Sequence, residues 1–462
     1  MRNLKTLMLL CLLFPLNSLA QSGGAVHEYR LDNGMKVIVK EDHRSPVLVS
    51  QVWYKVGSSY EHDGITGISH VLEHMMFKGT KNHGPNEFSR IIAENGGREN
   101  AFTSRDYTAY FQQLEKSRLE VSFKLEADRM RHLLLKPEEF AKEVKVVMEE
   151  RRMRTEDNPQ SLTYEQFNAV AYLNSPYRIP VIGWMGDLES LHVDDLKRWY
   201  SLWYAPNNAV LVVVGDVDPQ QVLALAKKHF GPLKPSKIEA LKQRPEIAQV
   251  GTRRITVKAP AELPYVMMGY KVPPRTTNPE EWEPYALEVL AGILDGGSSA
   301  RFAKHLVRDT QIAAQAGAGY DLDSRDQSLL ILDGTPSQGH DIAELEQALR
   351  DQVKRVRDDL VSEDELKRVK AQVMASDVYQ LDSVFYQAMK IGTLEAMGLS
   401  WRVAENYLER VKAVTAEQVR EVARKYLVDD RLTVAVLDPQ PIDEERARRM
   451  QHGQQGGGNH VR

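Results

Sequence analysis

The hydrophobic pattern along the first third of the chain changes period twice. Residues 26–58 carry β-branched and aromatic runs interrupted at "DNG" and "EDHRSP", which predicts two strands. Residues 99–114 alternate between apolar and polar side chains and predict another strand. Helical spacing of apolar residues, with Gly as a stop signal, predicts short helices at 67–77 and 84–97 and long ones at 114–134 and 137–155.

A second pattern occurs twice. Residues 192–222 predict a helix, a polar turn, the buried strand "AVLVVVGDV" and another helix. Residues 415–439 again give a helix, a short polar turn and a strand that ends in Asp-Pro. We interpret the two as a diverged internal repeat, although helix–strand units are common enough to recur by chance.

The repeat predicts two similar domains. A Lys- and Pro-rich stretch between the copies is typical of a linker, and strands followed by helices start again after it. The expected fold class is α+β, with a sheet flanked by helices in each domain. The expected boundaries are an N-terminal domain at 21–235, a linker at 236–251, a C-terminal domain at 252–440 and a polar, Gly-rich, disordered tail at 441–462.

The first twenty residues differ from the rest. Arg2 and Lys5 precede an apolar run, and "SLA" before Gln21 resembles a cleavage site, so residues 1–20 predict a secretory signal peptide rather than a buried N-terminal helix. The run is too short to span a bilayer. Its removal would also remove Cys11, the single cysteine, and leave a periplasmic or secreted protein without disulfides.

Composition narrows the class of protein. The chain has 462 residues, 42% of them hydrophobic and 27% charged, and a net charge of −4. These values are ordinary for a globular protein of two or more domains. The slightly acidic balance gives no indication of nucleic-acid binding, and no later run is long enough for a membrane span.

Candidate chemistry lies in "HVLEH", residues 70–74. His70 and His74 are one helical turn apart, so both imidazoles can reach one metal ion. Glu73 lies near the same face and can act as a base beside the metal, and the order H-x-x-E-H is a metallopeptidase signature. The alternative is three polar residues on a solvated helix face.

A catalytic zinc site needs a third protein ligand. Glu143, Glu149 and Glu150 follow on one predicted helix, and Glu143 and Glu150 share a face because they are seven residues apart. One of them can bind metal while another supports a ligand histidine. A salt-bridged surface helix is the alternative.

Several segments together resemble the M16 metallopeptidases, in particular the half-size bacterial and mitochondrial members. They are "LDNGMKVIV", "HVLEHMMFKGT", "GGRENAFTSRDYTAY", "RIPVIGW" and "YAPNNAVLVVVGDVD". The resemblance implies two homologous α/β-roll domains (LuxS/MPP-like), each with a mixed sheet flanked by helices. It also implies one Zn²⁺ per chain.

By this resemblance His70, His74 and Glu150 are the zinc ligands. Glu73 is then the catalytic base and Glu143 a catalytic carboxylate that supports the ligands. Glu149 competes with Glu150, and the E-x₆-E spacing favours Glu150.

The resemblance also implies how substrate is held. Asn100 and Ala101 are expected on an exposed strand that pairs with the peptide main chain. Arg308 is expected to contact substrate from the second domain, but Gln315 stands where the family has a Tyr. That departure suggests a dimer, and a homologous subunit that lacks HxxEH and supplies the Arg/Tyr pair is one form it can take.

The expected function is zinc-dependent endopeptidase activity on short or unfolded peptides in a clamshell chamber. The alternative is a non-catalytic or partner-dependent scaffold of the same fold. The enzyme is favoured over the scaffold because all four groups are present: His70, Glu73, His74 and Glu150.

Overall fold

The computed structural model describes residues 24–239, 241–242, 244–277 and 281–442. The expected signal peptide, with Cys11, and almost all of the expected tail lie outside these residues. Within them, no helix is both long and apolar enough to cross a bilayer.

The described residues of the first half form a six-stranded sheet and eight α-helices. The sheet order is β1-β2-β6-β3-β5-β4. The strands are β1 Val26–Arg30, β2 Lys36–Glu41, β3 Val47–Tyr54, β4 Arg98–Thr103, β5 Thr108–Glu115 and β6 Ala209–Gly215. The helices are α1 Ile68–Met75, α2 Glu87–Glu94, α3 Leu119–His132, α4 Pro137–Arg151, α5 Pro159–Ala171, α6 Met185–Ser190, α7 Val193–Trp203 and α8 Pro219–His229.

The second half forms a five-stranded sheet with order β7-β11-β8-β10-β9. The strands are β7 Arg253–Pro260, β8 Tyr265–Val272, β9 Ala313–Tyr320, β10 Ser328–Pro336 and β11 Leu432–Gln440. The α-helices are α9 Glu283–Asp295, α10 Ile342–Asp358, α11 Glu363–Gln380, α12 Val384–Ala396, α13 Tyr407–Ala413 and α14 Ala416–Tyr426. One π-helix, Arg152–Glu156, continues α4, and another, Phe302–Asp309, lies between α9 and β9.

The two sheets share one topology. Strand β6 lies parallel to β2 and antiparallel to β3, and β11 lies likewise parallel to β7 and antiparallel to β8. The repeated helix–strand units of the sequence are α7–β6 and α14–β11, and both strands occupy this same position. The predicted mixed sheets flanked by helices are therefore present in both halves.

Two details of the strand prediction were wrong. Residues 26–58 form three strands, because "DNG" and "HRSP" each make a turn. Residues 99–114 form two antiparallel strands, β4 and β5, because the chain reverses at Ser104–Tyr107, where the Ser104 N–H donates to the Tyr107 carbonyl at 2.8 Å. Alternation continues through this tight turn, so periodicity alone did not reveal it.

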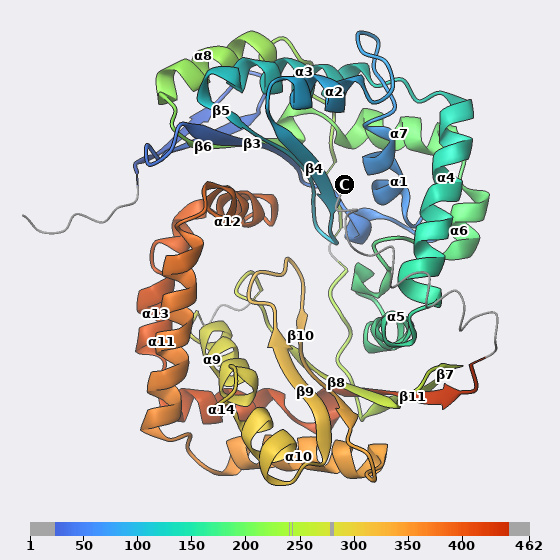
Figure 1. Ribbon diagram of the computed structural model, residues 1–462, viewed down its shortest axis with the longest axis vertical. Coiled ribbons are helices and arrows are strands. Elements are labelled where there is room, and N and C mark those ends of the chain that lie inside the picture. The colour runs from blue at the N-terminus through green and yellow to red at the C-terminus, as the bar shows by residue number, and fades with distance from the viewer. Residues whose placement is uncertain (1–23, 240, 243, 278–280, 443–462) are drawn as a thin grey trace, which may run out of the picture.

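Each sheet is covered by helices on both faces. On one of these faces the covering helix belongs to the other half of the chain (Figure 1). Helix α12 of the second half packs on the first sheet, where Ile391 meets Trp53 and Val212. Helix α5 of the first half packs on the second sheet, where Phe167 meets Met267. This double cover explains why β6 and β8 are buried along their whole length, as mixed sheets with helices on both faces require.

Both exchanged helices approach their sheet at a glycine. A Cβ on Gly392 of α12 would lie 2.0 Å from Cε2 of Trp53 in β3, and a Cβ on Gly269 of β8 would lie 2.5 Å from Cζ of Phe167 in α5. The aromatic side chain therefore occupies the space above each glycine. No larger residue fits without moving the helix away from the sheet.

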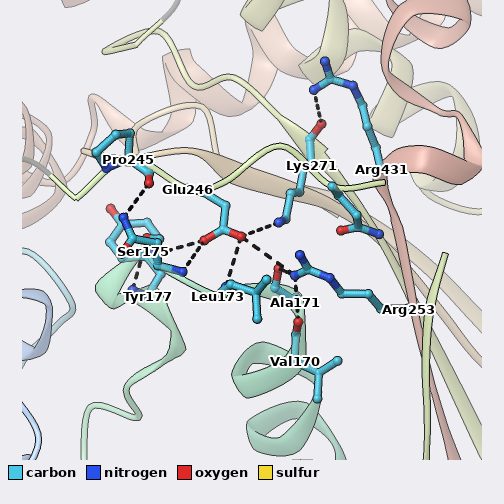
Figure 2. A network of polar contacts seen from close by, with 12 residues as sticks. Val170, Ala171, Leu173, Ser175, Tyr177, Pro245, Glu246, Arg253, Lys271 and Arg431 are labelled. Carbon is cyan, nitrogen blue, oxygen red and sulfur yellow. Dashed lines mark hydrogen bonds and ion pairs between the residues drawn. The ribbon is translucent and has the colours of Figure 1, made fainter. Parts of the chain in front are cut away.

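The predicted linker at 236–251 has no helix or strand among its described residues, and Glu246 ties it to both halves (Figure 2). The carboxylate is fully buried and accepts hydrogen bonds from the backbone N–H groups of residues 173–175 at 2.9–3.0 Å. It also pairs with Lys271 of β8 at 2.6 Å. Burial acts to raise the pKa of Glu246, but these donors hold it below its usual value, so the group stays charged.

Candidate metal centre

Helix α1 presents two different faces because its apolar residues recur at helical spacing. Val71, Leu72 and Met75 are buried in the core of the first half, which leaves His70 and His74 on the side toward α4. The start of the helix is held by buried Glu61, whose carboxylate accepts hydrogen bonds from the N–H groups of residues 67 and 69 at 2.7 and 2.9 Å. This contact satisfies donors that a helix start leaves unpaired.

Helix α4 supplies carboxylates to the same place. Val144 and Val147 pack into the core, and Glu143 and Glu150, two turns apart, face α1. An oxygen of Glu150 lies 3.4 Å from Nε2 of His74 and 3.8 Å from Nε2 of His70. The predicted ligand set is therefore brought together from two helices.

The three side chains fit a zinc ion. One donor atom from each of His70, His74 and Glu150 lies within 4.8 Å of the others, and among the described residues this is the group with such geometry. Tetrahedral zinc with bonds of about 2.0–2.2 Å places neighbouring donor atoms roughly 3.3–3.5 Å apart. Small side-chain movements bring the observed separations into this range, and two imidazoles with one carboxylate are a donor set typical of catalytic zinc.

Glu143 orients His74. Its carboxylate lies 3.1 Å from Nδ1 of His74 and 2.7 Å from Nζ of Lys78. A proton on Nδ1 leaves Nε2 free as the metal-binding atom. Glu143 therefore contacts His74 and is not among the three donor atoms of the candidate site, and Lys78 balances its charge.

The two imidazoles have different proton affinities. Burial and the neighbouring His74 lower the pKa of His70 to about 4, so that ring is neutral near pH 7. Burial also acts to lower the pKa of His74, but hydrogen bonds to Glu143 and Glu150 outweigh it and raise the value to about 9. In the absence of a cation, the two carboxylates thus favour a proton on His74.

Glu73 points toward strand β4, where its carboxylate accepts a hydrogen bond from the hydroxyl of Thr103. Burial raises the pKa of Glu73, and the Thr103 hydroxyl partly opposes that rise. Glu73 thus sits beside the ligand set and is not counted among its three donors.

The choice between Glu149 and Glu150 is decided by their directions. The side chain of Glu149 is 60% exposed and pairs with Arg152 at 2.9 Å, whereas that of Glu150 is 14% exposed and faces the histidines. The second oxygen of Glu150 forms an ion pair with Arg154 at 2.8 Å.

A cavity of about 1100 Å³ opens beside these residues. It is lined by His70, Glu73, His74 and Glu150, by strand β4, by residues 177–182 and by Phe385 from helix α12 of the second half. Strand β4 is an edge strand that pairs with β5 on one side, and its Asn100 and Ala101 line the cavity. The predicted edge position of Asn100 and Ala101 is therefore present.

The predicted contact from the second half is placed elsewhere. Arg308 lies at the end of the π-helix Phe302–Asp309, and its guanidinium donates to the carbonyl of Ser298. Gln315 is exposed on the edge strand β9. Neither residue is among those that line the cavity beside His70.

Sequence reasoning missed four residues near the candidate site: Thr103, Lys78, Arg154 and Arg105. Arg154 is four residues after Glu150, so helical spacing could have indicated it, whereas Lys78 lies beyond the end of α1 and reaches Glu143 of α4. Thr103 reaches Glu73 across a sheet edge, and no local pattern predicts that contact.

Family comparisons agree with this geometry. The family model described as insulinase (peptidase family M16) matches residues 36–183, and that described as the peptidase M16 inactive domain matches residues 190–373. Together these segments cover more than half of the chain. The chain belongs to the M16 peptidase family.

Individual M16 relatives match along nearly the whole length. A protein named zinc protease PqqE from Helicobacter pylori is 34% identical over 432 residues, which cover 91% of this chain and 94% of that protein. The crystal structure of a protease from Helicobacter pylori is 31% identical and superposes with a TM-score of 0.85 over 90% of this chain and 100% of that one.

An M16 structure of lower identity shares the fold. The peptidase M16 inactive domain from Pseudomonas fluorescens is 16% identical, has a TM-score of 0.81 and covers 91% of this chain and 100% of that one. The two-sheet architecture is thus that of M16-like proteins. The match to the family's inactive domain begins at residue 190, within the first half, and extends to residue 373 in the second, whereas His70, His74 and Glu150 lie before it.

Proposed function

We propose that this protein is a zinc-dependent endopeptidase that hydrolyses short or unfolded peptides in the cavity between its two halves. The observation that carries the proposal is the meeting of His70, His74 and Glu150, with Glu73 beside them, at the wall of that cavity. Relatives named zinc proteases support zinc as the metal.

His70, His74 and Glu150 would hold the ion. When bound, Zn²⁺ supplies Lewis-acid polarisation of a carbonyl and lowers the pKa of a water molecule toward about 7. Glu73 accepts the proton of the attacking water and returns it to the leaving amine. Glu143 keeps His74 in the tautomer that ligates, through the hydrogen bond at Nδ1.

The edge strand β4 would bind the substrate. A peptide that adds to this free edge forms main-chain hydrogen bonds with residues such as Asn100 and Ala101 and passes Glu73, which Thr103 holds against the strand. Main-chain recognition tolerates many sequences but needs an extended peptide. Folded proteins are therefore poor substrates.

The test is the variant Glu73→Gln. We expect it to bind one zinc ion per chain, as the wild type does, and to hydrolyse peptides about 10²–10⁴-fold more slowly, because the general base is lost. Metal analysis and peptidase assays, each with and without a chelator, measure both. Hydrolysis at the wild-type rate would show that Glu73 is not the base.

The second candidate is a partner-dependent or non-catalytic scaffold. Two observations favour it: the second half matches a domain described as inactive, and Arg308 and Gln315 lie away from the cavity. A homologous subunit without HxxEH would then form a dimer and supply the Arg/Tyr pair. Mass measurement in solution and assays with and without such a subunit distinguish the cases, since full activity of the isolated chain excludes the need for a partner.

The cell compartment is a further part of the proposal. The signal peptide expected at residues 1–20 would place the mature protein in the periplasm or outside the cell. N-terminal sequencing of protein from fractionated cells tests this, and an intact Met1 on cytoplasmic protein would contradict it.

A further inference from the structure

The cavity beside the candidate metal centre is lined by three arginines, Arg105, Arg154 and Arg178. Two of them are neutralised by carboxylates. Arg154 pairs with Glu150 at 2.8 Å, and Arg178 donates two hydrogen bonds of 2.8 Å to Asp63. Arg105 is the third and differs from both.

The guanidinium of Arg105 touches aromatic side chains instead. It lies 5.1 Å from the ring centre of Tyr177 and donates one hydrogen bond of 3.3 Å to the hydroxyl of Tyr164. Among the residues that the structure describes, no carboxylate lies within ion-pair distance of Arg105. Stacking on Tyr177 uses the face of the guanidinium and leaves N–H groups at its edge.

The carboxylates nearest in the chain and across the cavity have other partners. Asp106 accepts hydrogen bonds from Ser59, Tyr177 and Arg325. Glu165 forms two hydrogen bonds with Arg151, at 2.7 and 2.8 Å. Neither is available to neutralise Arg105.

A half-buried guanidinium without a counter-ion is costly, because it loses hydration and gains no attraction in return. A carboxylate from a ligand removes that cost. Arg is also the side chain whose planar fork of donors matches a carboxylate with two parallel hydrogen bonds. The site therefore suits an anionic group of the bound peptide.

The position of Arg105 relative to Glu73 sets which part of the peptide it meets. Arg105 lies two residues after Thr103, which contacts Glu73, in the turn Ser104–Tyr107 that follows β4. Arg105 and Glu73 both line the cavity, so a peptide that adds to β4 and continues past Thr103 has a residue near Arg105 when its bond lies at Glu73.

We propose that Arg105 is a specificity-determining residue that binds a peptide carboxylate near the cleaved bond. The carboxylate is that of an Asp or Glu side chain or the free C-terminus of the peptide. This inference rests on the proposed peptidase function, and it names acidic peptides as the preferred substrate class.

The first experiment measures kcat/KM on matched peptides. Pairs that differ by Glu against Gln at each position next to the cleaved bond test side chains, and free against amidated C-termini test the terminus. We expect the wild type to favour one carboxylate-bearing set by about tenfold or more, as a hydrogen-bonded charge pair implies. In Arg105→Gln the ratio falls to about one, chiefly through KM.

Two further variants act as controls. Arg105→Lys keeps the charge but loses the planar fork, so we expect it to retain only part of the preference. It also serves as the test variant should Arg105→Gln fail to fold. Arg178→Gln removes a charge from the same cavity whose partner is Asp63, and the preference should be unchanged. Equal preference in the wild type and Arg105→Gln, or none in the wild type, would overturn the proposal.

The second experiment separates this proposal from the proposed function. Binding of fluorescently labelled Glu and Gln peptides to the Glu73→Gln variant is measured by anisotropy, with and without Arg105→Gln. A preference for the Glu peptide that disappears with Arg105 supports the anion site even if no peptide is ever hydrolysed. Hydrolysis by the wild type without any such preference instead preserves the function and rejects the role of Arg105.

Discussion

Helix α1 in the first half and helix α9 in the second occupy the same place in two sheets of the same topology. Each follows the strand that pairs with β6 or β11 and precedes the edge strand, β4 or β9. Each also packs against a long helix, α4 or α11. The side chains at these two helix–helix contacts nevertheless differ in chemistry.

Between α1 and α4 lie His70, His74 and Glu150, beside a cavity. Helices α9 and α11 meet closely at Gly292, since a Cβ there would lie 2.7 Å from Cγ1 of Val369. The sequence of α9, "EPYALEVLAGILD", also contains no histidine. Among the described residues, the second half thus offers no comparable set of metal-binding side chains at this position.

The same fold therefore provides a location for a metal site in each half, but the fold alone does not create the site. Two helices beside an edge strand form a candidate active centre only where they carry metal-binding side chains at a cavity. Where glycine and valine fill the contact, the same arrangement is a hydrophobic core. This difference agrees with the match of the second half to the family's inactive domain.

The largest expected effect comes from removing a ligand. Glu150→Gln should bind no zinc at micromolar free metal and should lose essentially all peptidase activity, because two histidines alone leave the site incomplete. Glu149→Gln, a change of the adjacent exposed residue, is the matched control and should bind one zinc per chain. Metal analysis after dialysis measures both.

Zinc titration also tests the comparison directly. A second tight zinc ion per chain, or one that persists in Glu150→Gln, would place a site outside α1 and α4. In that case the two halves would not differ as described.

A smaller effect is expected for the residue that supports a ligand. Glu143→Gln keeps an oxygen near Nδ1 of His74 but loses the charge, so zinc affinity should fall by about 10–100-fold. Competition with a chromophoric chelator measures it. Glu139→Gln, on the same helix and paired with Lys142 at 2.9 Å, should bind zinc as the wild type does. Equal affinity for Glu143→Gln would remove its assigned role.

The smallest expected effect is on the packing of the second half. Gly292→Ala should lower the free energy of unfolding, because overpacking against Val369 costs about 1–3 kcal/mol, while helix propensity returns at most ~1 kcal/mol. In a Val369→Ala background the same change should become neutral or stabilising. Denaturant titration of the four proteins forms a double-mutant cycle.

Gly186 in helix α6 provides the matched control, since nothing lies within 4 Å of the place its Cβ would take. Gly186→Ala should be neutral or stabilising. If Gly292→Ala behaves like Gly186→Ala, α9 and α11 are not closely packed, and the contrast with α1 and α4 loses its physical basis.

Much of the fold followed from local patterns. Helical spacing predicted helices near 67–77 and 137–155, and the structure has α1 at Ile68–Met75 and α4 at Pro137–Arg151. The repeated helix–strand unit indicated a duplicated sheet. The exchange of α5 and α12 between the two sheets could not be predicted, because a buried helix face does not identify the sheet that it covers.

Prediction of the candidate site from the sequence had different limits. The spacing of His70, Glu73 and His74 indicates a shared helix face, and E-x₆-E indicates another. Spacing alone did not separate Glu149 from Glu150, since that depends on the direction in which α4 faces α1. Arg308 is a different kind of miss. The resemblance to the family predicted that it contacts substrate, but among the described residues it does not line the cavity and contacts Ser298 instead.

The sequence by itself determined which chemical groups are present and which of them share a helix face, because helix geometry depends only on spacing along the chain. The tertiary structure alone decided that α1 and α4 bring His70, His74 and Glu150 together beside a cavity, while α9 and α11 meet at Gly292 and Val369. It also left Arg105 in the cavity with aromatic neighbours and no described carboxylate in reach. Those outcomes depend on side chains far apart in sequence, whose packing and pairing no local pattern records.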